Sequence, residues 1–113
     1  MCSSLRGGLR IAVTRLTGDD ARVVAAVFEA PMSREQALEL ARLMQEGRPT
    51  RPEGVLTAAL AFEDGVARLT AYWRDRDTLE RYLEETPVPR GMELMRKVGV
   101  EPSMRIVEVL ELG

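Results

Sequence analysis

The chain alternates short, wholly apolar segments with stretches in which apolar residues recur every three or four positions. Residues 23–28, Val-Val-Ala-Ala-Val-Phe, form a continuous apolar run, and Pro31 follows closely. A run of this length is typical of a strand buried on both faces, but it also fits part of a helix. We predict a central strand, because a strong helix start comes directly afterwards. The alternative is a helix over residues 20–29, capped by Asp19 or Asp20.

A helix is predicted to begin at Ser33. Gln36 has the spacing of a capping box, in which each of the two side chains satisfies a free backbone N–H. The apolar residues that follow share one helix face, and they are Ala37, Leu40, Ala41 and Met44, widened by Leu38 and Leu43. Gly47 stands where helices commonly end on a residue with positive φ. We therefore expect a loop from Arg48 to Gly54.

Two strands joined by a hairpin are predicted next. Residues 55–63 and 66–74 alternate in the way of half-buried strands, and Glu63-Asp64-Gly65 is a turn sequence. One face carries Leu56, Ala58, Leu60, Phe62, Ala67, Leu69, Ala71 and Trp73. The other face carries Val55, Thr57, Ala59, Ala61, Val66, Arg68, Thr70 and Tyr72.

The last third of the chain predicts two helices and a closing strand. Asp77 opens the first helix, whose apolar side is Leu79, Tyr82 and Leu83, and Pro87 ends it. A short helix over about residues 89–98 turns Met92, Met95 and Val98 inward and stops at Gly99. Residues 104–112 form the final strand.

The order of elements from residue 22 onward is β-α-β-β-α-β, the ferredoxin-like arrangement of an α+β fold. Residues 9–16 add an N-terminal strand, which would pair at a sheet edge or reach a partner subunit. We expect one domain over residues 9–113, preceded by a flexible N-terminus over residues 1–8. A different α+β fold, beginning with strand 9–16 and a helix over 20–29, is the alternative.

Composition restricts the chemistry more than the fold. The chain has 113 residues, a net charge of −2 and no histidine, and its one cysteine is Cys2. A strongly basic nucleic-acid-binding protein is excluded by this charge balance. Without histidine or paired cysteines, zinc lacks its usual ligands and a Ser-His-Asp mechanism is impossible. We expect no metal and no cofactor.

The chain shows no segment that targets it to a membrane or out of the cell. No apolar run approaches the roughly 18 residues of a membrane span. The first residues lack the apolar stretch of a signal peptide, and a lone cysteine gives no internal disulfide. A cytoplasmic protein without a membrane partner is the expectation.

From about Val23 to Leu112 the chain resembles the antibiotic-biosynthesis-monooxygenase-like group of dimeric α+β barrels. The resemblance lies in the strand that runs into the capped helix at Ser33, the strand opened by Gly54-Val55, and Tyr72-Trp73 at the end of the hairpin. It implies a homodimer in which two sheets pack face to face. The apolar character of the sheet face that carries Val55 and Tyr72 fits such a dimer, because water is a poor environment for it.

The same resemblance implies oxidation of aromatic or haem-like substrates without a metal or flavin. The polar residues usually assigned to that work are an asparagine and a tryptophan, with a histidine in the haem-degrading branch. Trp73 matches the tryptophan. The chain contains neither asparagine nor histidine, so no residue matches the other two.

The candidate ligand-binding residues are aromatic and methionine side chains. They are Phe28, Phe62, Tyr72, Trp73, Tyr82, Met44 and Met95, with Met92 as a further part of the wall. Such side chains line pockets, and they equally form ordinary cores. The candidate catalytic residues are Trp73, Arg68 and Glu108. A charged side chain on an apolar strand face needs a partner when buried, so Arg68 and Glu108 either handle a proton or form salt bridges, with each other or across the dimer.

These patterns predict a small homodimer with a mostly apolar pocket that binds a hydrophobic or aromatic molecule. One alternative is a cofactor-independent monooxygenase that lacks the usual asparagine and histidine. A further alternative is a non-catalytic protein that acts through its dimer surface. Whether the protein is an enzyme stays open on the sequence.

Overall fold

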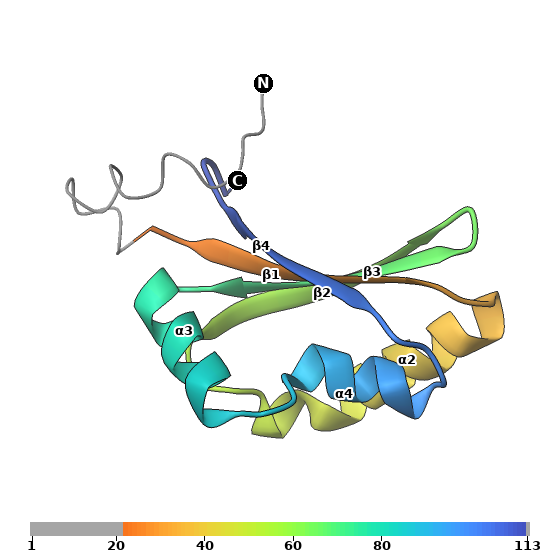
Figure 1. Ribbon diagram of the computed structural model, residues 1–113. Helices are drawn as coiled ribbons and strands as arrows, with labels where there is room; N and C mark the ends of the chain where they lie inside the picture. Colours follow the sequence, from red (N-terminus) through yellow and green to blue (C-terminus); the bar gives the residue numbers. More distant parts are fainter. Residues whose placement is uncertain (1–21, 113) are drawn as a thin grey trace.

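The fold is a four-stranded antiparallel sheet with helices packed against one face (Figure 1). The structure is a computed structural model and describes residues 22–112. The strands are β1 (Val24–Pro31), β2 (Val55–Glu63), β3 (Val66–Trp73) and β4 (Ser103–Glu108). The helices are α2 (Arg34–Gly47), the short 3-10 helix η2 (Arg48–Thr50), α3 (Arg76–Glu85) and α4 (Arg90–Lys97). The predicted strand 9–16, the flexible segment 1–8 and Cys2 lie outside the described residues.

The element order and the sheet order β2-β3-β1-β4 confirm the ferredoxin-like α+β fold. In this order β1 is hydrogen-bonded to β3 on one side and to β4 on the other. The alternative prediction, a helix over residues 20–29, is therefore wrong where the structure describes this segment, because β1 begins at Val24. The apolar run suits a central strand, because its side chains are buried on both faces between the neighbouring strands.

A β-bulge near the start of β2 changes which side chains of this strand face the helices. Val55 pairs with Trp73, but the next pair is Thr57 with Tyr72, so the register shifts around Leu56. The extra residue turns Leu56 away from the helices, and it is 47% exposed. Val55 packs against the core instead. The predicted alternation was therefore wrong for Val55 and Leu56, and right from Ala58 onward.

Helix α2 begins with the predicted capping box. Ser33 Oγ accepts a hydrogen bond from Gln36 N at 3.1 Å, and Ser33 N donates to Gln36 Oε1 at 2.8 Å. Ala37 and Leu40 are buried as expected, but Leu38 is 59% exposed and does not belong to the apolar face. Its position differs from that of Ala37 by about 100° around the helix, which is enough to turn it toward solvent.

The end of α2 also differs from the prediction. Gly47 has φ −88°, so positive φ is not the reason for a glycine at this position. A Cβ on Gly47 would collide with the guanidinium of Arg90, which lies directly against the backbone there. The chain does not loop freely after Gly47 but continues into η2.

Two further boundaries need correction in the C-terminal part. Asp75, rather than Asp77, is the N-cap of α3, because Asp75 Oδ1 accepts a hydrogen bond from Thr78 N at 2.7 Å. This bond lowers the pKa of the Asp75 carboxyl. Strand β4 ends at Glu108 instead of Leu112, because its partner β1 begins at Val24, and one further bond, from Val109 N to Val23 O at 3.1 Å, follows the last register pair. Within residues 22–112, no helix has the length and apolarity needed to cross a membrane.

The close approach of α4 to the sheet gives a stability prediction. A Cβ at Gly91 would lie 2.5 Å from Phe28 Cδ2 and 2.9 Å from Leu69 Cδ2, and both partners are buried. Replacing glycine by alanine in a helix normally stabilises a protein by about 0.5–1 kcal/mol. We expect Gly91→Ala to have the opposite sign and to cost about 1–3 kcal/mol, as overpacking does.

Urea denaturation of Gly91→Ala beside the wild type measures this difference. Glu93→Ala, in the same helix but on its exposed side, is the control and should change the free energy of unfolding by less than about 0.5 kcal/mol. A stabilised Gly91→Ala protein would contradict the tight packing of α4.

Candidate functional site

A cavity of about 110 Å³ lies between the sheet and the helices, partly open to solvent. Its floor is the helix-facing side of the sheet, and its walls are α2, η2, α3 and the N-terminal half of α4. The lining residues of the floor are Ala26, Phe28, Val55, Ala58, Leu69, Ala71, Trp73 and Met104. Those of the walls and mouth are Met44, Gly47, Arg48, Arg51, Pro52, Leu79, Tyr82, Leu83, Pro89, Arg90, Gly91 and Leu94.

A row of alanines across the sheet explains why space remains there. Ala71 on β3 pairs with Ala26 on β1 and with Ala58 on β2, so three methyl groups lie side by side below the helices. Larger residues lie on the same face on either side of the row in β3, namely Leu69 and Trp73. These larger side chains keep the helices at a distance from the sheet, and the alanine side chains are too short to fill the space between. The cavity therefore follows from the alternation of small and large residues in the strands.

Trp73 lines the cavity and is 3% exposed. Its ring lies 5.0 Å from that of Tyr82, centroid to centroid, with the planes inclined by 40°. The Cε3 and Cζ3 atoms face Gly54, at the start of β2. The indole nitrogen is on the opposite edge of the ring, and its N–H donates no hydrogen bond within residues 22–112. A buried indole N–H usually has an acceptor, so the N–H of Trp73 is a donor that no described residue uses.

Tyr82 connects α3 to the beginning of α4. Its hydroxyl oxygen accepts a hydrogen bond from Arg90 N at 2.8 Å, which satisfies one of the free N–H groups at the start of that helix. The aromatic ring contacts the core and Trp73. The hydroxyl therefore has a structural role, while the ring forms part of the cavity wall.

Arg90 holds the mouth of the cavity in place. Its guanidinium donates to Gly47 O and Thr50 O, both at 2.8 Å, and to Thr50 Oγ1 at 3.2 Å. These oxygens belong to the last residue of α2 and to η2, where helix carbonyls have no partner in the helix itself. A cation is favourable at this end of the helix dipole. The contact fixes the segment that carries Arg48 and Arg51 next to α4.

The structure distributes the predicted ligand-binding residues over three places. Phe28, Met44, Trp73 and Tyr82 line the cavity. Met95 is fully buried in the core, and Phe62 packs against the core from β2, without lining the cavity. Tyr72 lies on the opposite face of the sheet, because neighbouring residues in a strand point to opposite sides. Met92 packs at the edge of the core.

Arg68 and Glu108 do not pair with each other, which was one of the alternatives; each forms an ion pair with another residue of the chain. Arg68 pairs in register with Glu29, whereas Glu108 pairs with Val24, and these positions lie on opposite faces of the sheet. Glu108 forms an ion pair with Arg22 at 3.0 Å. Neither Arg68 nor Glu108 lines the cavity.

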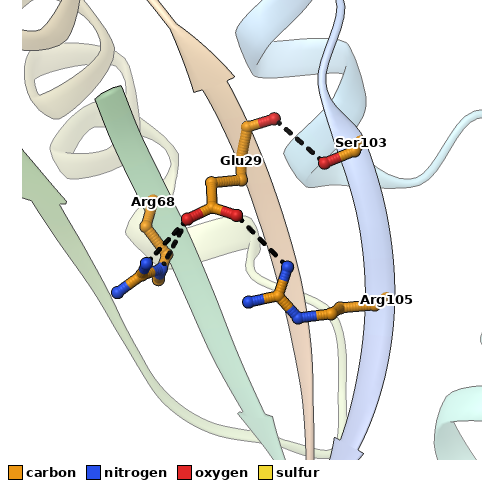
Figure 2. A network of polar contacts seen from close by, with 4 residues as sticks. All are labelled: Glu29, Arg68, Ser103 and Arg105. Atoms are coloured by element: carbon orange, nitrogen blue, oxygen red, sulfur yellow. Dashed lines mark hydrogen bonds and ion pairs between the residues drawn. The ribbon is translucent and has the colours of Figure 1, made fainter. Parts of the chain in front are cut away.

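Arg68 belongs to an ion network on the sheet face away from the helices (Figure 2). Its Nε and Nη2 donate to Glu29 Oε2 at 3.0 and 2.7 Å, and Arg105 Nη1 donates to Glu29 Oε1 at 3.2 Å. Ser103 Oγ donates to the backbone oxygen of Glu29 at 3.4 Å. The bonds from Arg68, and next those from Arg105, lower the pKa of the Glu29 carboxyl. This carboxylate is therefore a poor base.

Sequence reasoning did not bring the residues at the mouth together. Arg90, Arg48 and Arg51 occur in segments that resemble ordinary charged loops and a helix start. Only the contact of Arg90 with Gly47, which are 43 residues apart, brings them together. Within the described part of the chain, no three acidic or cysteine side chains cluster in a way that could hold a metal ion.

No known protein family's profile matches the chain, and no curated protein matches it. Solved structures do resemble it. SnoaB, a cofactor-independent oxygenase from Streptomyces nogalater, has 18% identity and a TM-score of 0.59 over 81% of this chain and 97% of its own. A provisionally named antibiotic biosynthesis monooxygenase from Bordetella bronchiseptica has 11% identity and a TM-score of 0.60 over 80% and 99%.

A further protein with the same provisional name, from Deinococcus radiodurans, has 17% identity and a TM-score of 0.54 over 80% of this chain and 95% of its own. These likenesses confirm the fold that the sequence resemblance implied. At such identities they show the fold alone, so an activity does not follow from them.

The ion network gives a prediction about pH. We expect the pKa of the Glu29 carboxyl to lie below its ordinary value in the wild type and to rise in Arg68→Ala, which removes the largest cause of the shift. Because the folded-state pKa is the lower one, the stabilising contribution of Glu29 is present above the unfolded-state pKa. It is lost as the pH falls through the folded-state pKa.

Carbon-detected NMR titration of the carboxyl groups measures this shift. Glu101, whose pKa is lowered by Arg96 in a separate ion pair, is the internal control and should titrate alike in both proteins. A Glu29 titration that Arg68→Ala leaves unchanged would show that the network does not form in solution.

Proposed function

We propose that this protein is a homodimer that binds a small hydrophobic or aromatic molecule in the cavity between its sheet and its helices. The observation that carries the proposal is the cavity itself. It is floored by three alanines and walled by apolar side chains, and Trp73 lines it. Protein interiors are normally packed without such gaps, so a binding role explains space that core packing does not require.

The aromatic part of the cavity favours a ligand with a flat ring. Trp73 and Tyr82 present ring faces and edges, against which an aromatic ligand packs in offset or edge-to-face geometry. The unused N–H of Trp73 favours a ligand that also has a hydrogen-bond acceptor. Engineered apolar cavities of about 150 Å³ bind benzene, so about 110 Å³ with an open mouth suits a single ring whose substituent extends outward.

The homodimer is supported by the other face of the sheet, which no described helix covers (Figure 1). Its exposed apolar side chains include Leu56, Val66 and Val107, at 47%, 37% and 38% exposure. Ala59, Ala61 and Tyr72 extend the same face between them. A second copy packed on this face would bury these side chains, and a two-fold dimer is the simplest symmetric solution.

A monooxygenase is the second candidate. It is favoured by the likeness to SnoaB, a cofactor-independent oxygenase, and by the position of Trp73 at the cavity. However, the described lining residues include no carboxylate that could act as a base, and the chain has no histidine. Binding therefore ranks before oxidation. Oxygen uptake on addition of a quinol, compared between wild type and Trp73→Phe, distinguishes the two.

The cavity is tested by filling it. Trp73 is the only tryptophan, so its fluorescence reports directly on the site. We expect aromatic ligands to change this fluorescence in the wild type and to bind at least about tenfold more weakly to Ala71→Leu, whose extra carbons occupy the space above the alanine row. Ala71→Ser, which keeps a small side chain, is the matched control and should still bind.

Equal binding by the wild type and Ala71→Leu would place the ligand elsewhere. A protein that binds nothing in the cavity but remains dimeric would support the non-catalytic role through its surface.

The dimer is tested by a charge on the uncovered face. We expect Leu56→Lys to shift the protein from dimer to monomer in light scattering after size exclusion, because a lysine at this position would be buried without a partner. Leu38→Lys is the control, since Leu38 is also an exposed leucine but lies on the outer side of α2. It should remain dimeric. A monomeric wild type would exclude the dimer directly.

A further inference from the structure

The charges at the cavity are all of one sign. Among residues 22–112, three arginines line it, Arg48, Arg51 and Arg90, and no aspartate or glutamate does. The chain as a whole has a slight acidic excess, with 18 acidic and 16 basic side chains, so this arrangement is a local departure. A purely apolar ligand would not need positive charges at the cavity.

These three arginines also differ from most others in the described part of the chain. Ion pairs with carboxylates are formed by Arg22, Arg42, Arg68, Arg74, Arg76, Arg96 and Arg105. Within residues 22–112, Arg48, Arg51 and Arg90 form none. Arg34 and Arg81 form none either, but they lie away from the cavity. The cations at the mouth are therefore not neutralised by the protein's own acids.

The segment that carries Arg48 and Arg51 is held in one shape. Arg90 binds Gly47 O and Thr50 O, and Arg51 N donates to Arg48 O at 3.2 Å. Thr50 Oγ1 donates to Gly47 O at 3.1 Å. The guanidinium of Arg90 is occupied by these contacts, whereas those of Arg48 and Arg51 donate to no described residue. Two free guanidinium groups thus project from a fixed turn at the rim of an apolar cavity.

We propose that the ligand is a small aromatic carboxylic acid, with its ring in the cavity and its carboxylate bound by Arg48 and Arg51 at the mouth. Guanidinium groups match carboxylates in charge and in geometry, with two parallel N–H···O bonds. The N-terminus of α4, at Arg90 and Gly91, adds the positive end of a helix dipole to the same region. The cavity volume limits the apolar part to about one ring.

This inference rests on the proposed binding function and names the chemical class of the ligand. It divides the site into two parts with separate tasks. Trp73, Tyr82 and the alanine row accept the ring, and Arg48 and Arg51 select for a negative charge. Arg90 is a positioning residue, because its contacts are to the backbone of the segment and not to the ligand.

The test compares an acid with its uncharged counterpart. The probes are 3-phenylpropanoate and 3-phenylpropanamide, which share a ring and a chain and differ in charge. Their dissociation constants are measured through Trp73 fluorescence and by calorimetry. At low ionic strength we expect the acid to bind about tenfold tighter than the amide, because charge-assisted hydrogen bonds are about twice as strong as neutral ones. Added salt should reduce that preference.

Variants at the mouth assign the preference to its residues. The double variant Arg48→Gln/Arg51→Gln should lose about tenfold in affinity for the acid and none for the amide. Both side chains are exposed, so the fold should be retained, and far-UV circular dichroism checks this. Arg34→Gln is the matched control, because Arg34 also forms no described ion pair but lies at the other end of α2. It should bind both probes as the wild type does.

The outcomes separate this inference from the proposed function. Equal affinity of the wild type for acid and amide would overturn the inference and leave cavity binding in place. An acid preference that survives in the double variant would overturn the role of Arg48 and Arg51. Failure of the wild type to bind either probe would count against the cavity as a binding site, and with it against both proposals.

Discussion

The structure depends on the hydrogen bonding of β1 along both of its edges. This strand occupies the centre of the sheet, so β3 and β4 can meet only through it. The sizes of its helix-facing residues Ala26 and Phe28 also determine how closely the helices can approach the sheet. Phe28 lies under Gly91 and brings α4 close, whereas Ala26 leaves a gap beside it. One strand therefore fixes both the packing of the core and the place where packing is incomplete.

Local patterns made most of the fold predictable. The capping box at Ser33, the Asp64-Gly65 turn and the alternation in β3 each depend on neighbours a few residues away, and each appears as expected. The bulge at Leu56 was not predictable, because the alternating residues around it fit an unbroken strand equally well. Its position depends on how β2 pairs with β3, and pairing is a property of two segments rather than one.

The candidate site shows the same division. Trp73 and Tyr82 could be identified from the sequence, since a large aromatic residue within a predicted strand or helix is visible without knowledge of the rest of the fold. The mouth of the cavity could not be identified from the sequence, because it is built by contacts between Arg90 and the distant segment from Gly47 to Thr50. Tyr72 was placed with the ligand-binding residues although alternation alone puts it on the opposite face from Trp73. In assigning a strand residue to a site, the alternation of side chains between the two faces is therefore a better guide than the type of the residue.

The two faces of the sheet have different chemistry, and this separates the two proposed roles physically. On the helix face, the charged side chains that line the apolar cavity are arginines at its mouth, and no described carboxylate lines it with them. On the uncovered face, Glu29 binds Arg68 and Arg105, so charges there are largely satisfied within one subunit (Figure 2). A paired network can be covered by a second copy at lower cost than isolated charges, because bonds within the chain already replace part of the hydrogen bonding with water. Free arginines, in contrast, still gain by binding an anion. The uncovered face therefore suits the proposed contact between two copies of the chain, and the cavity mouth suits the reversible binding of a negatively charged ligand.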